Sequence, residues 1–142
     1  MRCAMLLLVP AVALLVAADD QADKDKKALQ GTWQVTSFEK DGQAVPEEKV
    51  KDMKVVIKDD MFSLSDGKKT ETVAFKLDPT KKPKEMDGTP DNQKDKTALF
   101  IYEIDGDTLK LCWNKAGGGA NPRPKEFTGK GTSGYMVLKR EK

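Results

Sequence analysis

Short stretches of alternating apolar and polar residues dominate the chain after its first thirty positions. They are rich in β-branched and aromatic side chains, which favour half-buried strands. Asp66-Gly67 and Asp105-Gly106 separate neighbouring stretches and indicate hairpins, because Asp and Gly tolerate the positive φ of a two-residue turn. The pattern predicts strands at residues 29–38, 54–59, 61–65, 69–77, 97–104, 108–113 and 133–140, and it allows a short strand at 84–87 within an otherwise loop-like stretch from 78 to 95.

Residues 46–53 interrupt this alternation. Pro46 suits a first helical turn and is followed by Glu47 and Glu48, which predicts a short helix. Strands joined by tight turns must be antiparallel, and a sheet of about eight strands can remove its two open edges by pairing the last strand with the first. The sequence therefore predicts an all-β fold, an antiparallel up-and-down β-barrel with one short helix near 46–53. A β-sandwich is the alternative.

The first eighteen residues have the three parts of an export signal. Arg2 is basic, residues 4–16 carry no charge, and Val16-Ala17-Ala18 offers small side chains for cleavage after Ala18. The apolar run is shorter than the roughly 20 residues of a membrane span, so no stable anchor is expected after cleavage. We expect a secreted or periplasmic protein with a signal peptide at 1–18, a flexible charged leader at 19–28 and one domain at 29–142.

The composition argues against nucleic-acid binding, metal binding and most catalytic mechanisms. The 25 basic and 23 acidic residues are interspersed, so there is no basic stripe for nucleic acid. Histidine is absent, which removes the commonest metal ligand and the usual general base near neutral pH. Cys112 is the only cysteine left after cleavage and is expected to be buried or simply inert. The glycines at 117–119 precede no helix and predict a loop. No catalytic, metal or cofactor site is predicted; we expect a monomer that is not an enzyme.

Gly31-Thr32-Trp33 at the start of the first strand and Arg140 at the end of the last resemble the lipocalin and calycin superfamily. The resemblance implies that Gly31, Trp33 and Arg140 close one end of the barrel, with the arginine stacked on the tryptophan. The chain is also similar to a family of exported lipocalin-like domains of unknown function, numerous in planctomycete bacteria. That similarity is carried by residues 29–33, 101–104, 106–112, 123–124, 127 and 138–140. Phe100 departs from it, since a small residue is expected there, and the family implies a fold but no activity.

Two functions fit such a barrel. Its interior is just wide enough either to be filled by side chains or to hold one small ligand. If the barrel is hollow, we expect an apolar or amphipathic ligand, with Tyr102 and Trp113 in the lining and Arg123 at the mouth, where it either anchors a loop by a salt bridge or meets an anionic group. The expected lining comprises Val35, Val55, Ile57, Phe62, Phe75, Ile101, Tyr102, Leu111 and Trp113. The alternative is a cell-envelope protein-interaction or structural module with a filled core.

Overall fold

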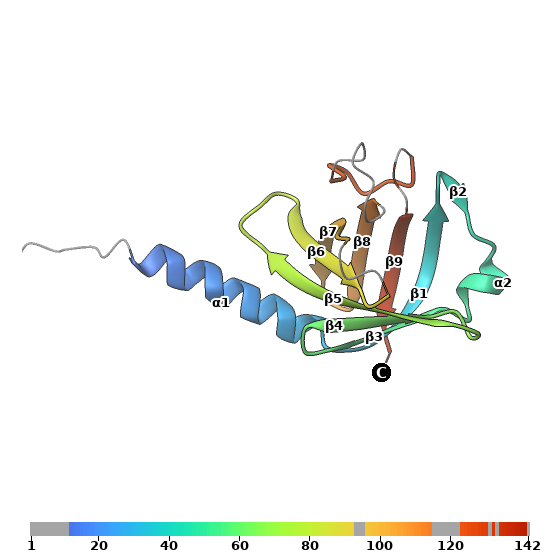
Figure 1. Cartoon of the computed structure of the whole chain (residues 1–142), viewed down its shortest axis with the longest axis horizontal. Coiled ribbons are helices and arrows are strands. Elements are labelled where there is room, and N and C mark those ends of the chain that lie inside the picture. Colours follow the sequence, from blue (N-terminus) through green and yellow to red (C-terminus); the bar gives the residue numbers. More distant parts are fainter. Residues whose placement is uncertain (1–11, 93–95, 115–122, 131, 133, 142) are drawn as a thin grey trace, which may run out of the picture.

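The strands of the chain follow one another in an antiparallel meander (Figure 1). The structure is a computed structural model and describes residues 12–92, 96–114, 123–130, 132 and 134–141. Within these ranges the strands are β1 (Gly31–Lys40), β2 (Gln43–Ala44), β3 (Lys54–Lys58), β4 (Met61–Ser65), β5 (Thr70–Asp78), β6 (Lys84–Pro90), β7 (Ala98–Asp105), β8 (Thr108–Asn114) and β9 (Gly134–Arg140). Each pairs antiparallel with its neighbours in the order β2-β1-β3-β4-β5-β6-β7-β8-β9.

Pairing between β1 and β9 closes the sheet into a barrel of eight strands, and β2 is one further strand beside β1. The predicted barrel is confirmed, and the β-sandwich alternative is wrong. Strand β1 pairs with β3 only through its first residues, from Gly31 to Gln34, whereas it pairs with β9 as far as Lys40. The wall is therefore open between the second half of β1 and β3, on the side where the short helix α2 (Glu47–Val50) lies. This helix lies within the predicted helical segment.

A β-bulge in β1 changes which of its side chains face inward. The register against β9 shifts between Val35 and Ser37. Trp33 and Val35 are buried in the interior, and after the extra residue it is Phe38 that packs against the core, not Ser37. A bulge of this kind bends the strand and shifts the two-residue alternation by one position. Odd-numbered residues of β1 face inward before the bulge, and even-numbered residues face inward after it.

Strand β6 is longer than the sequence predicts. Residues 78–95 were expected to be mostly loop, yet Lys84–Pro90 pairs on both sides, with β5 and β7. Its inward positions include Met86 and Gly88, both buried, while Glu85 and Asp87 pair outward with Arg123. Charged outer residues and an inner glycine disguise the alternation, which explains why the sequence indicates only the first part of this strand, at 84–87.

Residues 19–28, predicted to be a flexible charged leader, are helical in the structure. They belong to helix α1 (Val12–Leu29), which extends away from the barrel in Figure 1 and crosses the predicted cleavage point without a break. Two residues in its C-terminal part contact the barrel: Leu29 is completely buried, and Asp25 is buried and accepts a hydrogen bond from Tyr102. Arg2 and Cys3 lie outside the described residues. Neither described helix combines the length and the apolar character needed to cross a membrane.

Candidate functional site

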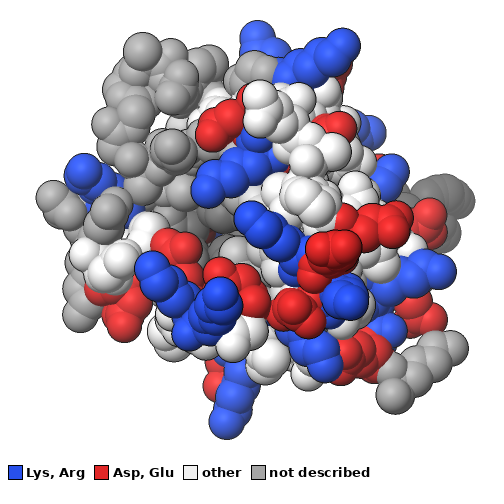
Figure 2. Space-filling view, turned by 90° about the vertical axis from the view of Figure 1, so that its right-hand side faces the viewer, with Lys and Arg blue, Asp and Glu red and all other residues white. Residues whose placement is uncertain are grey.

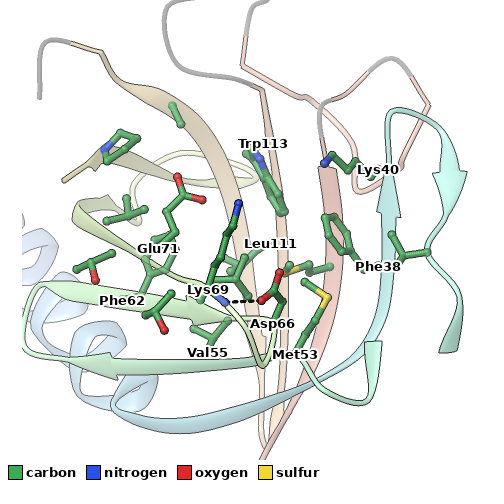
Figure 3. Close-up of a pocket in the computed structure, with 18 of the residues that line it drawn as sticks. Phe38, Lys40, Met53, Val55, Phe62, Asp66, Lys69, Glu71, Leu111 and Trp113 are labelled. Atoms are coloured by element: carbon green, nitrogen blue, oxygen red, sulfur yellow. Dashed lines mark hydrogen bonds between the residues drawn. The ribbon is translucent and has the colours of Figure 1, made fainter. Parts of the chain in front are cut away.

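The barrel is hollow at one end. A pocket with a volume of about 1310 Å³ opens where β1, β6 and β8 end and where β5 and β9 begin, beside α2 and the β4–β5 turn (Figure 3). Its apolar lining consists of Phe38, Val45, Met53, Val55, Phe62, Leu64, Val73, Pro90, Ala98, Phe100, Leu111, Trp113 and Met136. These side chains come from the inward positions of most barrel strands, so the pocket is a continuation of the core that side chains do not fill.

Charged residues surround this apolar surface. They are Lys40, Glu48, Lys49, Asp52, Asp66, Lys68, Lys69, Glu71, Asp91 and Lys96, five basic and five acidic. Figure 3 shows the Lys69 and Glu71 side chains rising from the β4–β5 hairpin into the pocket. Figure 2, which views the side carrying α2, shows both charges interspersed on the surface. The described residues of the rim therefore carry no net charge that would select a strongly anionic or cationic molecule.

Asp66 is held in its charged form at the β4–β5 turn. Its carboxylate accepts hydrogen bonds from the backbone N–H of Lys69 at 2.8 Å and of Lys68 at 2.9 Å. These two bonds lower the pKa of the Asp66 carboxyl below its ordinary value. They also fix the hairpin turn, which forms one side of the pocket.

The opposite end of the barrel is closed. The guanidinium of Arg140 lies over the Trp33 ring, with 4.3 Å between its central carbon and the ring centroid, and Trp33 is completely buried. The Trp33 indole N–H donates to the Leu29 carbonyl at 2.8 Å, and Arg140 donates to the carbonyls of Gln30, at 2.7 Å, and Ala28. Gly31 has φ +120°, and a Cβ there would lie 3.4 Å from Arg140 Nη1. Residues 31, 33 and 140 thus meet as the resemblance implies, and the end of α1 covers them.

Tyr102 does not line the pocket, so its assignment to the ligand site is wrong. It points inward at the closed end, where its hydroxyl donates to Asp25 Oδ2 at 2.8 Å. Lys84 Nζ lies 2.9 Å from the same carboxylate oxygen. Burial, and then the hydrogen bond and charge of Asp25, raise the pKa of Tyr102 far above its usual value. Alternation along β7 predicts the correct face for Tyr102 but not the end of the barrel at which it lies.

Arg123 is held by the outside of β6 and is absent from the pocket lining. Its guanidinium lies 3.3 Å from Glu85 and pairs with Asp87, and it donates to the carbonyls of Met86 and Phe100. The salt-bridge interpretation is therefore confirmed, and Arg123 does not line the described pocket. The glycines at 117–119 lie outside the described residues.

Trp113 is the one predicted ligand-site residue that lines the pocket. Of the other expected lining residues, Val55, Phe62 and Leu111 also line it. Val35, Ile57 and Phe75 instead fill the barrel interior outside the pocket. Ile101 faces outward, opposite Cys112, whose thiol lies 3.4 Å from the Thr128 carbonyl. Segment 123–130 thus contacts this outer face, which explains why an outward strand position is completely buried.

Phe38, Phe100 and Met136 line the pocket but were not among the expected residues. Phe38 was hidden by the β1 bulge, since strict alternation from Trp33 and Val35 predicts that Ser37 faces inward. Phe100 and Met136 occupy inward positions that alternation along β7 and β9 could have found.

No group of three or more metal-ligating side chains occurs in the part of the chain that the structure describes. Comparisons with protein-family models, with curated proteins and with solved structures gave no match. The resemblance to exported lipocalin-like domains therefore stays a prediction, and the functional argument is based on the pocket.

Proposed function

We propose that this protein binds a small apolar or amphipathic molecule inside its barrel. The observation that carries the proposal is the open pocket of about 1310 Å³ with thirteen apolar side chains in its lining. Small-molecule sites typically have volumes of about 300–1,000 Å³ and are mostly apolar with a few polar groups. Because this pocket includes an open mouth, its volume suits a ligand of that class.

The two ends of the barrel have different roles in this proposal. The closed end is filled by side chains such as Trp33, Leu109 and Leu138, each with no solvent exposure. It supplies the stability that a hollow barrel loses from its other end. The ligand then enters beside α2, places its apolar part against the inner wall and leaves any polar group among the charges of the rim.

Export is the second part of the proposal. Cleavage after Ala18 would leave residues 19–29, and with them both Asp25 and Leu29, on the mature chain. The contacts of α1 with the closed end would thus survive processing. Mass spectrometry of the protein from its own host would test this, with a mature chain starting at Asp19 as the expected result. Recovery of the intact chain would contradict it.

Ligand binding is tested by pocket filling. The protein purified from its host is analysed by native mass spectrometry, and thermal unfolding is measured against a panel of apolar and amphipathic compounds. Ala98 of β7 lines the pocket and pairs with Gly88 of β6, which has no side chain. The substitution Ala98→Phe should therefore narrow the pocket. Ala74 is exposed on the outside of β5, and Ala74→Phe is the matched control.

We expect a bound compound, or a rise in melting temperature, in the natural protein and in Ala74→Phe but not in Ala98→Phe. A ligand that binds only the folded state stabilises it by an amount that grows with the ligand concentration relative to the dissociation constant, which is why the melting temperature reports binding. No bound compound and no shift across the panel would contradict the proposal. Equal shifts in all three proteins would place the binding site elsewhere.

A further inference from the structure

The aromatic residues of the pocket form one continuous wall. Ring centroids of Phe38 and Trp113 lie 5.8 Å apart, those of Trp113 and Phe100 lie 5.4 Å apart, and those of Phe100 and Phe62 lie 5.8 Å apart. The four residues come from four strands, β1, β8, β7 and β4, and all of them line the pocket. Aromatic side chains therefore make up a surface that crosses much of the barrel.

The orientations of these rings favour a flat ligand. Adjacent planes differ by 32° between Phe38 and Trp113 and by 30° between Trp113 and Phe100, while Phe62 is nearly perpendicular to Phe100 at 85°. Aromatic groups prefer either offset stacking or edge-to-face contact. A flat ring system against this wall can make both kinds of contact. A flexible alkyl chain gains only the burial of its surface.

Two glycines let the rings lie close to the sheet. Gly134 of β9 lies opposite Trp113 of β8, and a Cβ at position 134 would come within 2.4 Å of the indole ring. Gly88 pairs with Ala98 instead, and a Cβ at Gly88 would come within 2.8 Å of the Phe100 ring. These rings therefore pack directly on backbone, which holds them in place in the pocket lining.

Trp113 also presents a hydrogen-bond donor. Its side chain is half-buried in the pocket lining, and its indole N–H has no hydrogen-bond partner among the described residues. The other tryptophan differs, since the Trp33 N–H donates to Leu29. A ligand that covers Trp113 without accepting this hydrogen bond would leave a desolvated donor, which costs free energy.

We infer, on the basis of the proposed function, that the ligand is a flat apolar ring system with a hydrogen-bond acceptor, such as a carbonyl oxygen, on its edge. The rings of the ligand stack on the aromatic wall as one further layer. The acceptor pairs with the Trp113 N–H. A single flexible acyl chain is a poorer match to both features.

Three soluble sulfonates test the flat ring system and the hydrogen-bond acceptor separately. Their dissociation constants for the full-length protein are measured by calorimetry. Tetradecanesulfonate and anthracene sulfonate share a charged group and a carbon count but differ in flatness. Anthraquinone sulfonate adds two edge carbonyls to the same ring frame. We expect anthracene sulfonate to bind about ten-fold more tightly than the alkyl compound, as two additional aromatic contacts would give. Anthraquinone sulfonate should bind about five-fold more tightly again, as one hydrogen bond would give.

Trp113→Phe tests the donor while keeping an aromatic ring in the wall. It should abolish the preference for anthraquinone over anthracene but keep the preference for the flat compound over the alkyl chain. Tyr135 contacts Phe127 instead of the pocket aromatics, so Tyr135→Leu is the matched control and should change neither preference. Thermal unfolding of both variants shows whether the fold is retained.

The outcomes distinguish this inference from the proposed function. Alkyl sulfonate binding as tight as that of anthracene sulfonate would overturn the flat-ring assignment and leave ligand binding itself supported. An anthraquinone preference that is absent, or that persists in Trp113→Phe, would overturn the acceptor assignment. Failure of all three compounds to bind the natural protein would count against both proposals.

Discussion

Asp25 of helix α1 accepts a hydrogen bond from the Tyr102 hydroxyl of strand β7, with 2.8 Å between the two oxygens. The residues are 77 positions apart, and both side chains are buried. This contact joins a segment that the sequence predicts to be flexible to the interior of the barrel. It makes the end of α1 part of the fold, and its removal has a measurable cost.

Asp25→Ala should lower the free energy of unfolding by about 1–3 kcal/mol, because the buried Tyr102 hydroxyl loses its acceptor. Lys84 also loses its partner, but it is partly exposed and can be solvated by water. Denaturant unfolding followed by circular dichroism measures the change. Asp23 is exposed on the same helix, and Asp23→Ala is the control that should leave stability unchanged. Equal stability of the two variants would show that α1 is not part of the cooperative unit.

Tyr102 should make stability depend on alkaline pH. Its pKa is raised in the folded protein by burial and then by Asp25, whereas the unfolded value is about 10. A raised pKa means that this contribution is fully present below pH about 10 and is lost as the pH rises further, since the unfolded chain then releases the proton first. Unfolding measured between pH 8 and 12 should show a steeper loss for the natural protein than for Tyr102→Phe. Parallel curves for the two proteins would contradict the prediction.

Trp33→Ala should destabilise the protein by about 3–5 kcal/mol, as truncation of a fully buried aromatic side chain does. The change removes the ring under Arg140 and the hydrogen bond to Leu29 in one step. Trp33→Phe keeps an aromatic ring and should cost less. Thermal and denaturant unfolding measure both variants. A Trp33→Ala variant as stable as the natural protein would show that this end of the barrel does not depend on the stack.

Alternation predicts the barrel and its strands well because a half-buried strand must place every second side chain inside. It fails at two kinds of position. The β1 bulge adds a residue that no local pattern reveals, and so Phe38 was missed. In β6 the alternation is present, but one of its inward positions is Gly88. A glycine does not mark a buried strand position as an apolar side chain would.

The candidate site was less predictable than the fold, for geometric reasons. Alternation says that Tyr102 and Trp113 both face inward, but depth along the barrel axis depends on strand register and tilt. Register places Tyr102 beside Lys84 at the closed end and Trp113 opposite Gly134 at the pocket. The helical contacts of Asp25 were hidden because its neighbours are charged, and only the fold brings Tyr102 to it.

Cys112 should react slowly in the native protein. Its thiol is completely buried on the outer face of β8 and lies 3.4 Å from the Thr128 carbonyl. Burial raises the pKa of this thiol, which lowers the fraction of reactive thiolate. In a Cys3→Ser variant Cys112 is the only thiol, so modification by a disulfide reagent at pH 8 reports on it alone. We expect modification to be slow in buffer and complete within the mixing time in denaturant. Rapid modification of the native protein would mean that segment 123–130 does not shield the thiol in solution.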